Sequence, residues 1–260
     1  MTLVLVGMIV LITHALEAVT GFGCTVLALP FVVYLLGLED GVMLLAVLAW
    51  VIALYFVITK RRHIQIKQYL IVAALAGAGL PVGMGLADTL PAATLKQALA
   101  CFIVVAAVIQ IVKACSVPWP WGNRPGPRPE AASPAPRYLY ASALLLPLGG
   151  VVHGAFAAGG PLVVLYASKA LPDKGRFRAT LCLLWATLNT VLMIDYALES
   201  RFTAAFGVRF AAMLPFLAAG IFAGEIIHNR VNAVMFRRMV FAVLLAVGIV
   251  MLVGSLMPHD

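Results

Sequence analysis

The side chains best suited to chemistry lie in one apolar stretch near the start of the chain. His14 and Glu17 are three residues apart, so a helix places them on one face. The turn Gly21-Phe-Gly23 and then Pro30 follow them. Ionisable side chains inside apolar segments are costly and usually face a cavity or one another. The pair therefore predicts either a binding or proton-relay site, or a structural hydrogen-bonded pair between packed helices.

A second stretch repeats this pattern in weaker form. His153 precedes Gly160 by seven residues, as His14 precedes Gly21, and Pro161 follows. No acidic residue accompanies His153, which could simply satisfy a backbone carbonyl. Protonated histidines could instead stabilise an anion, and histidines that titrate near neutrality could couple its transport to protons. The proton-coupling residues predicted from the two stretches are His14, Glu17 and His153.

Composition places the chain in a membrane. Its 260 residues are 63% hydrophobic and 11% charged, whereas soluble domains carry about 25% charged residues. The apolar runs are continuous and do not alternate, which predicts spanning helices in a lipid bilayer. The net charge of +8 comes from basic residues that flank these runs, so no nucleic-acid partner is expected. The four cysteines lack metal-site spacing; we expect them to pack, and we expect no metal or other cofactor.

The apolar runs form two sets of four, which predicts an all-α polytopic membrane protein built from two repeats. Gly79 and Gly83 in one set match Gly220 and Gly224 in the other, a spacing typical of close helix packing. The runs are 3–36, 41–59, 68–87 and 95–113, then 138–168, 179–198, 202–227 and 239–257. The predicted units are a first repeat at 1–114, a Pro-rich cytoplasmic linker at 115–137 and a second repeat at 138–260.

The first run of each repeat is unusual in length. Runs 3–36 and 138–168 exceed one crossing but are too short for two crossings and a turn, and both carry central glycines. This combination predicts a broken, re-entrant hairpin, which a membrane tolerates only where the hairpin is buried in protein or lines a cavity.

The basic residues support the hairpin topology. If each first run enters and leaves on one side, fifteen of the eighteen basic residues are cytoplasmic, whereas eight simple crossings place ten there. Three crossings then remain in each half, and this odd number makes the halves inverted. Inverted repeats with broken helices that meet near the midplane are a common plan of secondary transporters. We therefore predict a transporter that works by alternating access.

These residues resemble the sulfite exporter TauE/SafE family, within the toluene-sulfonate uptake permease group. An acidic residue four positions before a glycine turn, followed by a proline, is matched by Glu17, Gly21, Gly23 and Pro30. The pattern of the family's second half is matched in this chain by Gly150–Pro161, by Phe177-Arg178-Ala179-Thr180 and by Asn189. The resemblance covers nearly the whole chain apart from the linker. It implies a multi-pass permease of the inner membrane, not an enzyme, that moves a small sulfur-containing anion such as sulfite, sulfoacetate or another organosulfonate.

The glycine turns are the predicted anion site. They supply unpaired backbone N–H groups and precede half-helices whose positive amino ends would point at the centre. A tight turn without a ligand is the alternative. Asn189 could equally bond between helices, and Arg178 could be an orientation signal. The predicted substrate-binding residues are His14, Glu17, Thr20, Gly21, Phe22, Gly23, His153, Gly159, Gly160, Pro161, Arg178 and Asn189.

Other functions remain open at this stage. The same fold could form an anion channel or a carboxylate transporter, or serve as a purely structural membrane subunit. An intramembrane enzyme could use His14, Glu17 and His153 as metal ligands, but the sequence indicates no second acidic or cysteine ligand nearby. The transport direction and the choice of anion are also open, and a homo-oligomer is compatible with the sequence.

Overall fold

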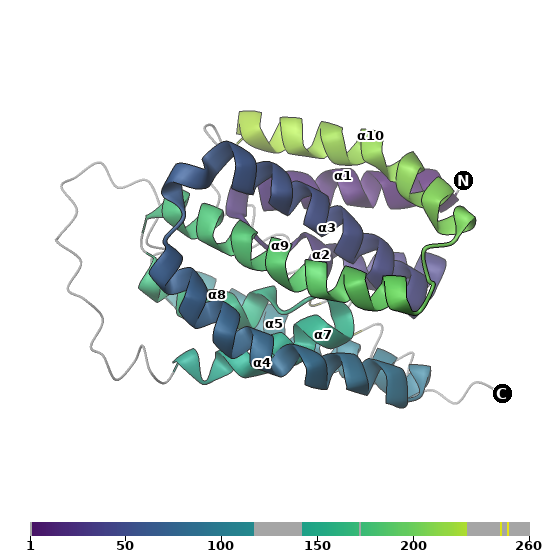
Figure 1. The fold of residues 1–260 in the computed structure, drawn as a ribbon, viewed down its shortest axis with the longest axis horizontal. Helices are drawn as coiled ribbons and strands as arrows, with labels where there is room; N and C mark the ends of the chain where they lie inside the picture. Colours follow the sequence, from purple (N-terminus) through teal and green to yellow (C-terminus); the bar gives the residue numbers. More distant parts are fainter. Residues whose placement is uncertain (1, 117–141, 172, 228–244, 246–248, 250–260) are drawn as a thin grey trace.

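The computed structural model describes residues 2–116, 142–171, 173–227, 245 and 249 (Figure 1). Its elements within these residues are all helical, as predicted, and six helices are long and apolar enough to cross a membrane. The elements are α1 (Thr2–Thr20), α2 (Cys24–Leu36), α3 (Leu38–Lys60), the 3-10 helix η1 (Arg61–His63), α4 (Ile66–Thr89), α5 (Ala92–Ser116), α7 (Leu145–Phe156), α8 (Gly160–Ala170), α9 (Lys174–Leu198) and α10 (Ala204–Ile227).

Two predicted segments fall largely outside the described residues. The run 239–257 belongs to a part of the chain that the structure describes only at residues 245 and 249. Of the predicted linker at 115–137, the structure describes the first two residues, which continue helix α5 to Ser116. The bounds of the linker stay a prediction.

Both long runs are broken where the glycines predict a break. Gly21 and Gly23 adopt φ angles of 82° and 99°, a left-handed conformation that glycine enters without a steric penalty. There α1 ends, and α2 folds back against it (Figure 1). In the second run α7 ends at Phe156, with Ala157 at φ 50°, and α8 begins at Gly160.

The two hairpins have unequal arms. Helix α1 has 19 residues and is itself a candidate membrane span. Helices α2, α7 and α8 have 13, 12 and 11 residues, well below the roughly 20 needed to cross. The total length of the first run did not reveal this asymmetry, because the break lies beyond its middle.

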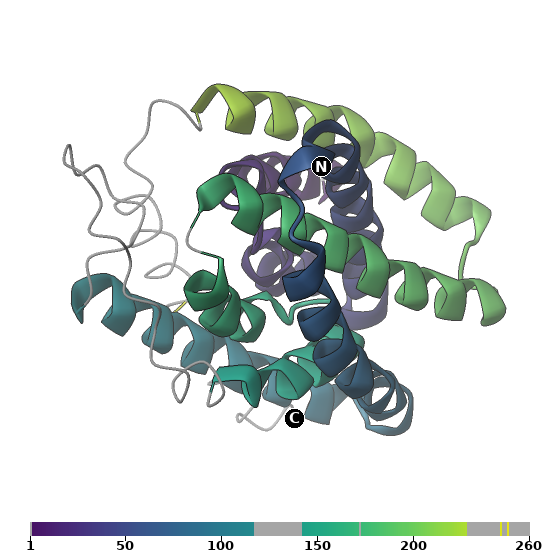
Figure 2. The same ribbon diagram turned by 60° about the vertical axis from the view of Figure 1, so that its left-hand side comes forward.

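The two halves of the chain hold each other's hairpins. Helix α1 packs against α10 and α4 packs against α7, while α3 and α9 pack together between these pairs (Figure 2). Gly79 and Gly83 lie against the backbone of α7, and Gly220 and Gly224 lie against that of α1. The packing interpretation of these glycines is confirmed. Each half thus packs one of its helices against the first helix of the other half, as expected of two related halves. The inversion of one half relative to the other stays a prediction.

Charged residues collect at the two ends of the helix bundle. At one end the Gln65 backbone N–H donates to Thr180 Oγ1 at 3.0 Å, which joins the segment after η1 to the start of α9. At the other end Arg201 pairs with Glu199 at 2.5 Å and Arg209 pairs with Asp40. The first end carries Lys60 to His63 and Lys174, and the second carries Glu39, Asp40 and Glu199.

Helix α9 starts earlier than residue 179, where the apolar run begins. Asp173 precedes it, and its Oδ1 accepts a hydrogen bond from the Arg176 N–H at 2.9 Å. An aspartate in this N-cap position satisfies a free N–H of the first turn. The basic residues Lys174, Arg176 and Arg178 therefore lie on the helix and not in a loop.

Candidate functional site

The turns of the two hairpins meet inside the protein. A Cβ atom added to Gly160 would lie 3.8 Å from the Phe22 ring and 4.0 Å from the Gly23 nitrogen. Next to this contact is a cavity of about 20 Å³, here called the inter-tip cavity, with room for about one water molecule. It is lined by Glu17, Gly23, Cys24, Thr25, Val26, Ala49, His153, Ala157, Ala158, Gly160, Trp185 and Asn189.

Two helix amino ends border the inter-tip cavity. Gly23 to Val26 form the start of α2, and Gly160 is the first residue of α8. Neither start is capped by a hydrogen bond from a side chain. The first N–H groups of a helix lack partners within the helix, and the helix dipole adds partial positive charge there. The cavity is therefore bordered by two groups of hydrogen-bond donors suited to an anion.

His153 and Asn189 form the polar wall of the cavity. His153 Nε2 lies 3.2 Å from Asn189 Oδ1, so with this amide orientation Nε2 carries the hydrogen and donates it. The other ring nitrogen, Nδ1, is buried and has no hydrogen-bond partner in the described part of the chain. A buried polar atom without a partner costs about 1–3 kcal/mol, so Nδ1 is available to a ligand or a proton.

Trp185 connects the two hairpins. Its ring stacks on His153 of α7 with the centroids 5.5 Å apart, and its Nε1–H donates to the Gly21 carbonyl oxygen at 3.2 Å. Trp185 is not among the residues predicted from the sequence. The available signal was its position four residues before Asn189, which places both on one helix face, together with an indole N–H that needs an acceptor in an apolar run.

We expect Trp185→Phe to lower the free energy of unfolding by about 1–3 kcal/mol, because the Gly21 carbonyl would lose its buried donor. Thermal unfolding in detergent measures the effect. Trp50→Phe is the matched control, because the Trp50 Nε1–H donates to Thr190 Oγ1 in an exposed position, where the loss should be below about 1 kcal/mol. Equal losses in both variants would contradict the bridging role of Trp185.

His14 and Glu17 lie on the same helix face but have different neighbours. His14 Nδ1 is 2.9 Å from the Val10 carbonyl oxygen, and His14 does not line the inter-tip cavity. The Glu17 carboxyl group lines the cavity together with the Cys24 thiol. Ligand atoms of His14, Glu17 and Cys24 all lie within 4.8 Å of one another. The expectation that no cysteine ligand lies near this pair is wrong, because the hairpin brings Cys24 back to α1.

Arg178 holds the end of α1. Its guanidinium donates to the Ala18 carbonyl oxygen at 2.7 Å and lies over the Phe56 ring, 4.5 Å from the centroid. Gly21 fits beneath it, because an added Cβ would lie 2.8 Å from Arg178 Cγ and 2.9 Å from its Cα. Arg178 therefore positions the first turn and does not line the inter-tip cavity.

The remaining predicted residues shape the turns. Thr20 Oγ1 bonds the Phe22 carbonyl oxygen at 2.8 Å, and the Phe22 ring meets Phe177 edge to face at 6.2 Å. Thr20, Phe22 and Pro161 line a second small cavity beside the first. At Gly159 an added Cβ would overlap the Gly149 carbonyl oxygen, so this position needs a residue without a side chain.

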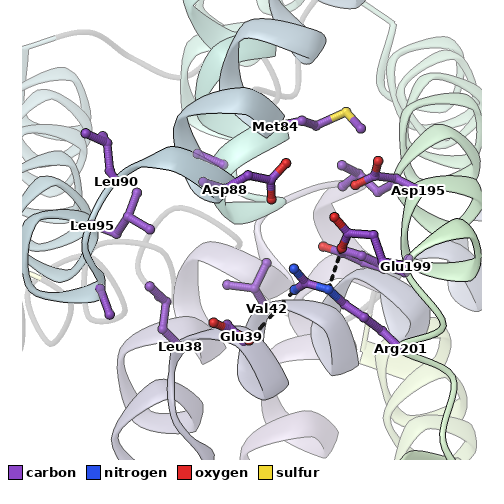
Figure 3. A pocket seen from close by; sticks show the side chains of 16 residues that line it. Leu38, Glu39, Val42, Met84, Asp88, Leu90, Leu95, Asp195, Glu199 and Arg201 are labelled. Atoms are coloured by element: carbon purple, nitrogen blue, oxygen red, sulfur yellow. Dashed lines mark ion pairs between the residues drawn. The ribbon is translucent and has the colours of Figure 1, made fainter.

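A larger cavity, of about 340 Å³, opens at the acidic end of the bundle (Figure 3). Gly154 and Ala155, which follow His153 on α7, form part of its wall. Its charged residues are Glu39, Asp88, Asp195, Glu199 and Arg201. Four carboxylates outweigh one guanidinium, so this acidic vestibule attracts cations. Its wall includes part of α7, the helix that carries His153.

The comparison with known families agrees with this arrangement. A family model described as sulfite exporter TauE/SafE matches residues 5–251, which include both hairpins. No curated protein and no solved structure matches the chain. The family comprises membrane transporters of sulfite and related sulfur anions, not enzymes, and the six candidate spans fit a multi-pass membrane protein. The chain therefore belongs to the sulfite exporter TauE/SafE family.

Proposed function

We propose that this transporter binds a small sulfur oxyanion or organosulfonate in the inter-tip cavity and moves it by alternating access, coupled to protons. One observation carries the proposal. The amino ends of α2 and α8 border the same cavity as His153 and Asn189. Backbone N–H groups from both hairpins can therefore bind one ligand, with a titratable side chain beside it.

The cavity suits an anion although no lysine or arginine of the described residues lines it. A sulfite or sulfonate group has three oxygens that each accept hydrogen bonds. The N–H groups near Cys24 and Gly160 can donate to these oxygens, and hydrogen bonds to a charged acceptor are about twice as strong as neutral ones. Partial charges at helix ends also leave no full charge buried when the anion departs.

The dimensions of the cavity support movement during transport. The cavity has room for about one water molecule, and a sulfur oxyanion is larger than water. The two turns must separate before the anion enters, and the Phe22 ring at Gly160 lies in the contact that would open. Movement of one hairpin relative to the other would expose the site to one end of the bundle at a time.

His153 is the residue we assign to proton coupling at the cavity. A protonated imidazole would bring both the proton and a positive charge to the anion, and release of the proton would weaken binding. Glu17 and Cys24 are the other titratable groups that line the cavity. The acidic vestibule supports this assignment, because it raises the local concentration of protons next to α7.

Flux into liposomes tests the proposal. Purified full-length protein would be reconstituted and supplied with sulfite, thiosulfate, sulfoacetate, taurine or simple carboxylates. We expect saturable flux of at least one sulfur anion, with accumulation against its gradient when a proton gradient is imposed. Flux of carboxylates without any sulfur anion would refute the substrate class. Flux that only equalises concentrations under every proton gradient would identify a channel instead.

A further inference from the structure

We propose that His14, Glu17 and Cys24 form a binding site for a divalent metal ion of the zinc type. The site lies where α2 folds back on α1. The three side chains come from two helices, are 0%, 2% and 1% exposed, and bring a ring nitrogen, a carboxylate oxygen and a sulfur within 4.8 Å of one another. No other group of three such ligands occurs among the described residues.

Two atoms of this group lack partners. Among the residues that the structure describes, His14 Nε2 and Glu17 Oε2 are buried and have no hydrogen-bond partner. Each such atom costs about 1–3 kcal/mol when left unsatisfied in a protein interior. Inside a membrane protein no bulk water relieves that cost. A metal ion held by the imidazole, the carboxylate and the thiolate would satisfy both atoms at once.

The orientation of His14 is that of a metal ligand. A carbonyl oxygen only accepts, so the contact of 2.9 Å between His14 Nδ1 and the Val10 carbonyl oxygen places the hydrogen on Nδ1. The lone pair of Nε2 is then free. Metal-binding histidines almost always donate their other N–H to a carbonyl or carboxylate in this way, which fixes the ring and its tautomer.

The donor set and the charge balance select the ion. Zinc accepts nitrogen, oxygen and sulfur ligands at about 2.0–2.3 Å, whereas magnesium and calcium prefer oxygen. Binding displaces one proton from the Cys24 thiol and one from the Glu17 carboxyl group if that group is protonated. The two negative ligands then balance the two positive charges of the ion. A monovalent copper ion would leave a net negative charge buried in an apolar interior, at a large cost in free energy.

The geometry needs a small adjustment and leaves one position open. Tetrahedral zinc requires ligand atoms about 3.3–3.8 Å apart, so the present separations of up to 4.8 Å must shorten by up to about 1–1.5 Å. Glu17 and Cys24 also line the inter-tip cavity, which holds about one water molecule. The fourth ligand would be that water. Resting on the proposed function, the ion would present positive charge to the transported anion.

Metal analysis of the full-length protein tests the site without any substrate. Protein purified in detergent without chelators, from zinc-supplemented cells, is expected to retain about one zinc ion per chain. After metal removal, Co²⁺ is the spectroscopic probe, and a thiolate-to-cobalt charge-transfer band is expected. Cys24→Ser should abolish the band and weaken zinc binding at least about 100-fold, because second-shell losses alone cost 10–100-fold. Cys182→Ser, a buried cysteine of α9 outside the cluster, should keep both.

Clear outcomes would overturn the site. Wild-type protein without zinc and without a cobalt–thiolate band refutes it, and so does zinc binding to Cys24→Ser with wild-type affinity. Cys24→Ser keeps the size and the hydrogen-bonding group, so folding can be confirmed by its elution and thermal unfolding. Glu17→Gln provides a second variant that removes a ligand. Because anion flux is not the readout, failure of the metal site leaves the transport proposal standing, and the reverse also holds.

Discussion

Replacing His153 with alanine should lower the flux of the transported sulfur anion by roughly 10- to 100-fold. The reason is the position of the ring in the inter-tip cavity, with Nδ1 unpartnered and Nε2 directed at Asn189. A hydrogen bond to a charged group contributes about 1.5–3 kcal/mol, which corresponds to this factor in affinity. Stimulation of flux by a proton gradient should also disappear, because His153 is the proposed proton carrier.

Variants of Asn189, the hydrogen-bond partner of His153, and of a nearby control residue test this prediction further. Asn189→Ala should reduce flux similarly, and the double variant should be little worse than either single one, because the two side chains act as one unit. Thr187→Val on the same helix removes a hydroxyl that bonds Tyr69 and does not line the cavity. It should retain near wild-type flux. Normal flux in His153→Ala, or fully additive losses, would remove this pair from the transport site.

The fold could be predicted from the sequence wherever a local cause determined it. Glycines in the middle of overlong apolar runs indicated both breaks. At the first break Gly21 and Gly23 adopt backbone angles that other residues avoid, whereas at the second the left-handed residue is Ala157. The start of α9 was missed, because the apolar run begins only at residue 179, whereas the helix begins at Lys174 after the capping residue Asp173. The unequal arms of the hairpins also escaped prediction. The length of an apolar run gives only the combined length of its two helices. It does not show where the chain breaks between them.

The candidate site was harder to predict, since its contacts join distant parts of the chain. Cys24 was expected only to pack, yet the hairpin places its thiol beside Glu17. Trp185 lies 164 positions from Gly21, whose carbonyl it bonds. Arg178 reaches the end of α1, a contact that its place in a basic segment did not suggest. Side-chain type and spacing identified His14, Glu17 and His153 as ionisable residues that are costly to bury in an apolar segment. Their partners become known only from the fold.

The glycines between helices connect the fold to the site. Gly83 of α4 lies against α7, the helix that carries His153, and an added Cβ would overlap the Val151 carbonyl oxygen and lie 2.9 Å from the Ala155 nitrogen. Backbone atoms cannot rotate away as a flexible side chain can, so α4 and α7 would have to separate. The imidazole of His153 would then move relative to Trp185 and Asn189, which are both on α9.

Gly83→Ala is therefore expected to destabilise the protein by about 1–3 kcal/mol, the usual cost of overpacking. The unfolding temperature should fall by about 2–10 °C. Gly85→Ala, two residues along the same helix, is the matched control, because nothing lies within 4 Å of its added Cβ. That variant should be neutral or more stable by up to about 1 kcal/mol, as alanine favours a helix over glycine.

The reciprocal position makes the prediction specific to the helix contact. Gly154 of α7 faces α4, and its added Cβ would overlap the Leu80 carbonyl oxygen and lie 2.8 Å from the Met84 nitrogen. Gly154→Ala should thus match Gly83→Ala in size, and both should reduce anion flux because the contact also positions His153. If both alanine variants unfold at the same temperature as Gly85→Ala, close packing of α4 on α7 does not hold the second hairpin. The inter-tip cavity would then need another source of rigidity.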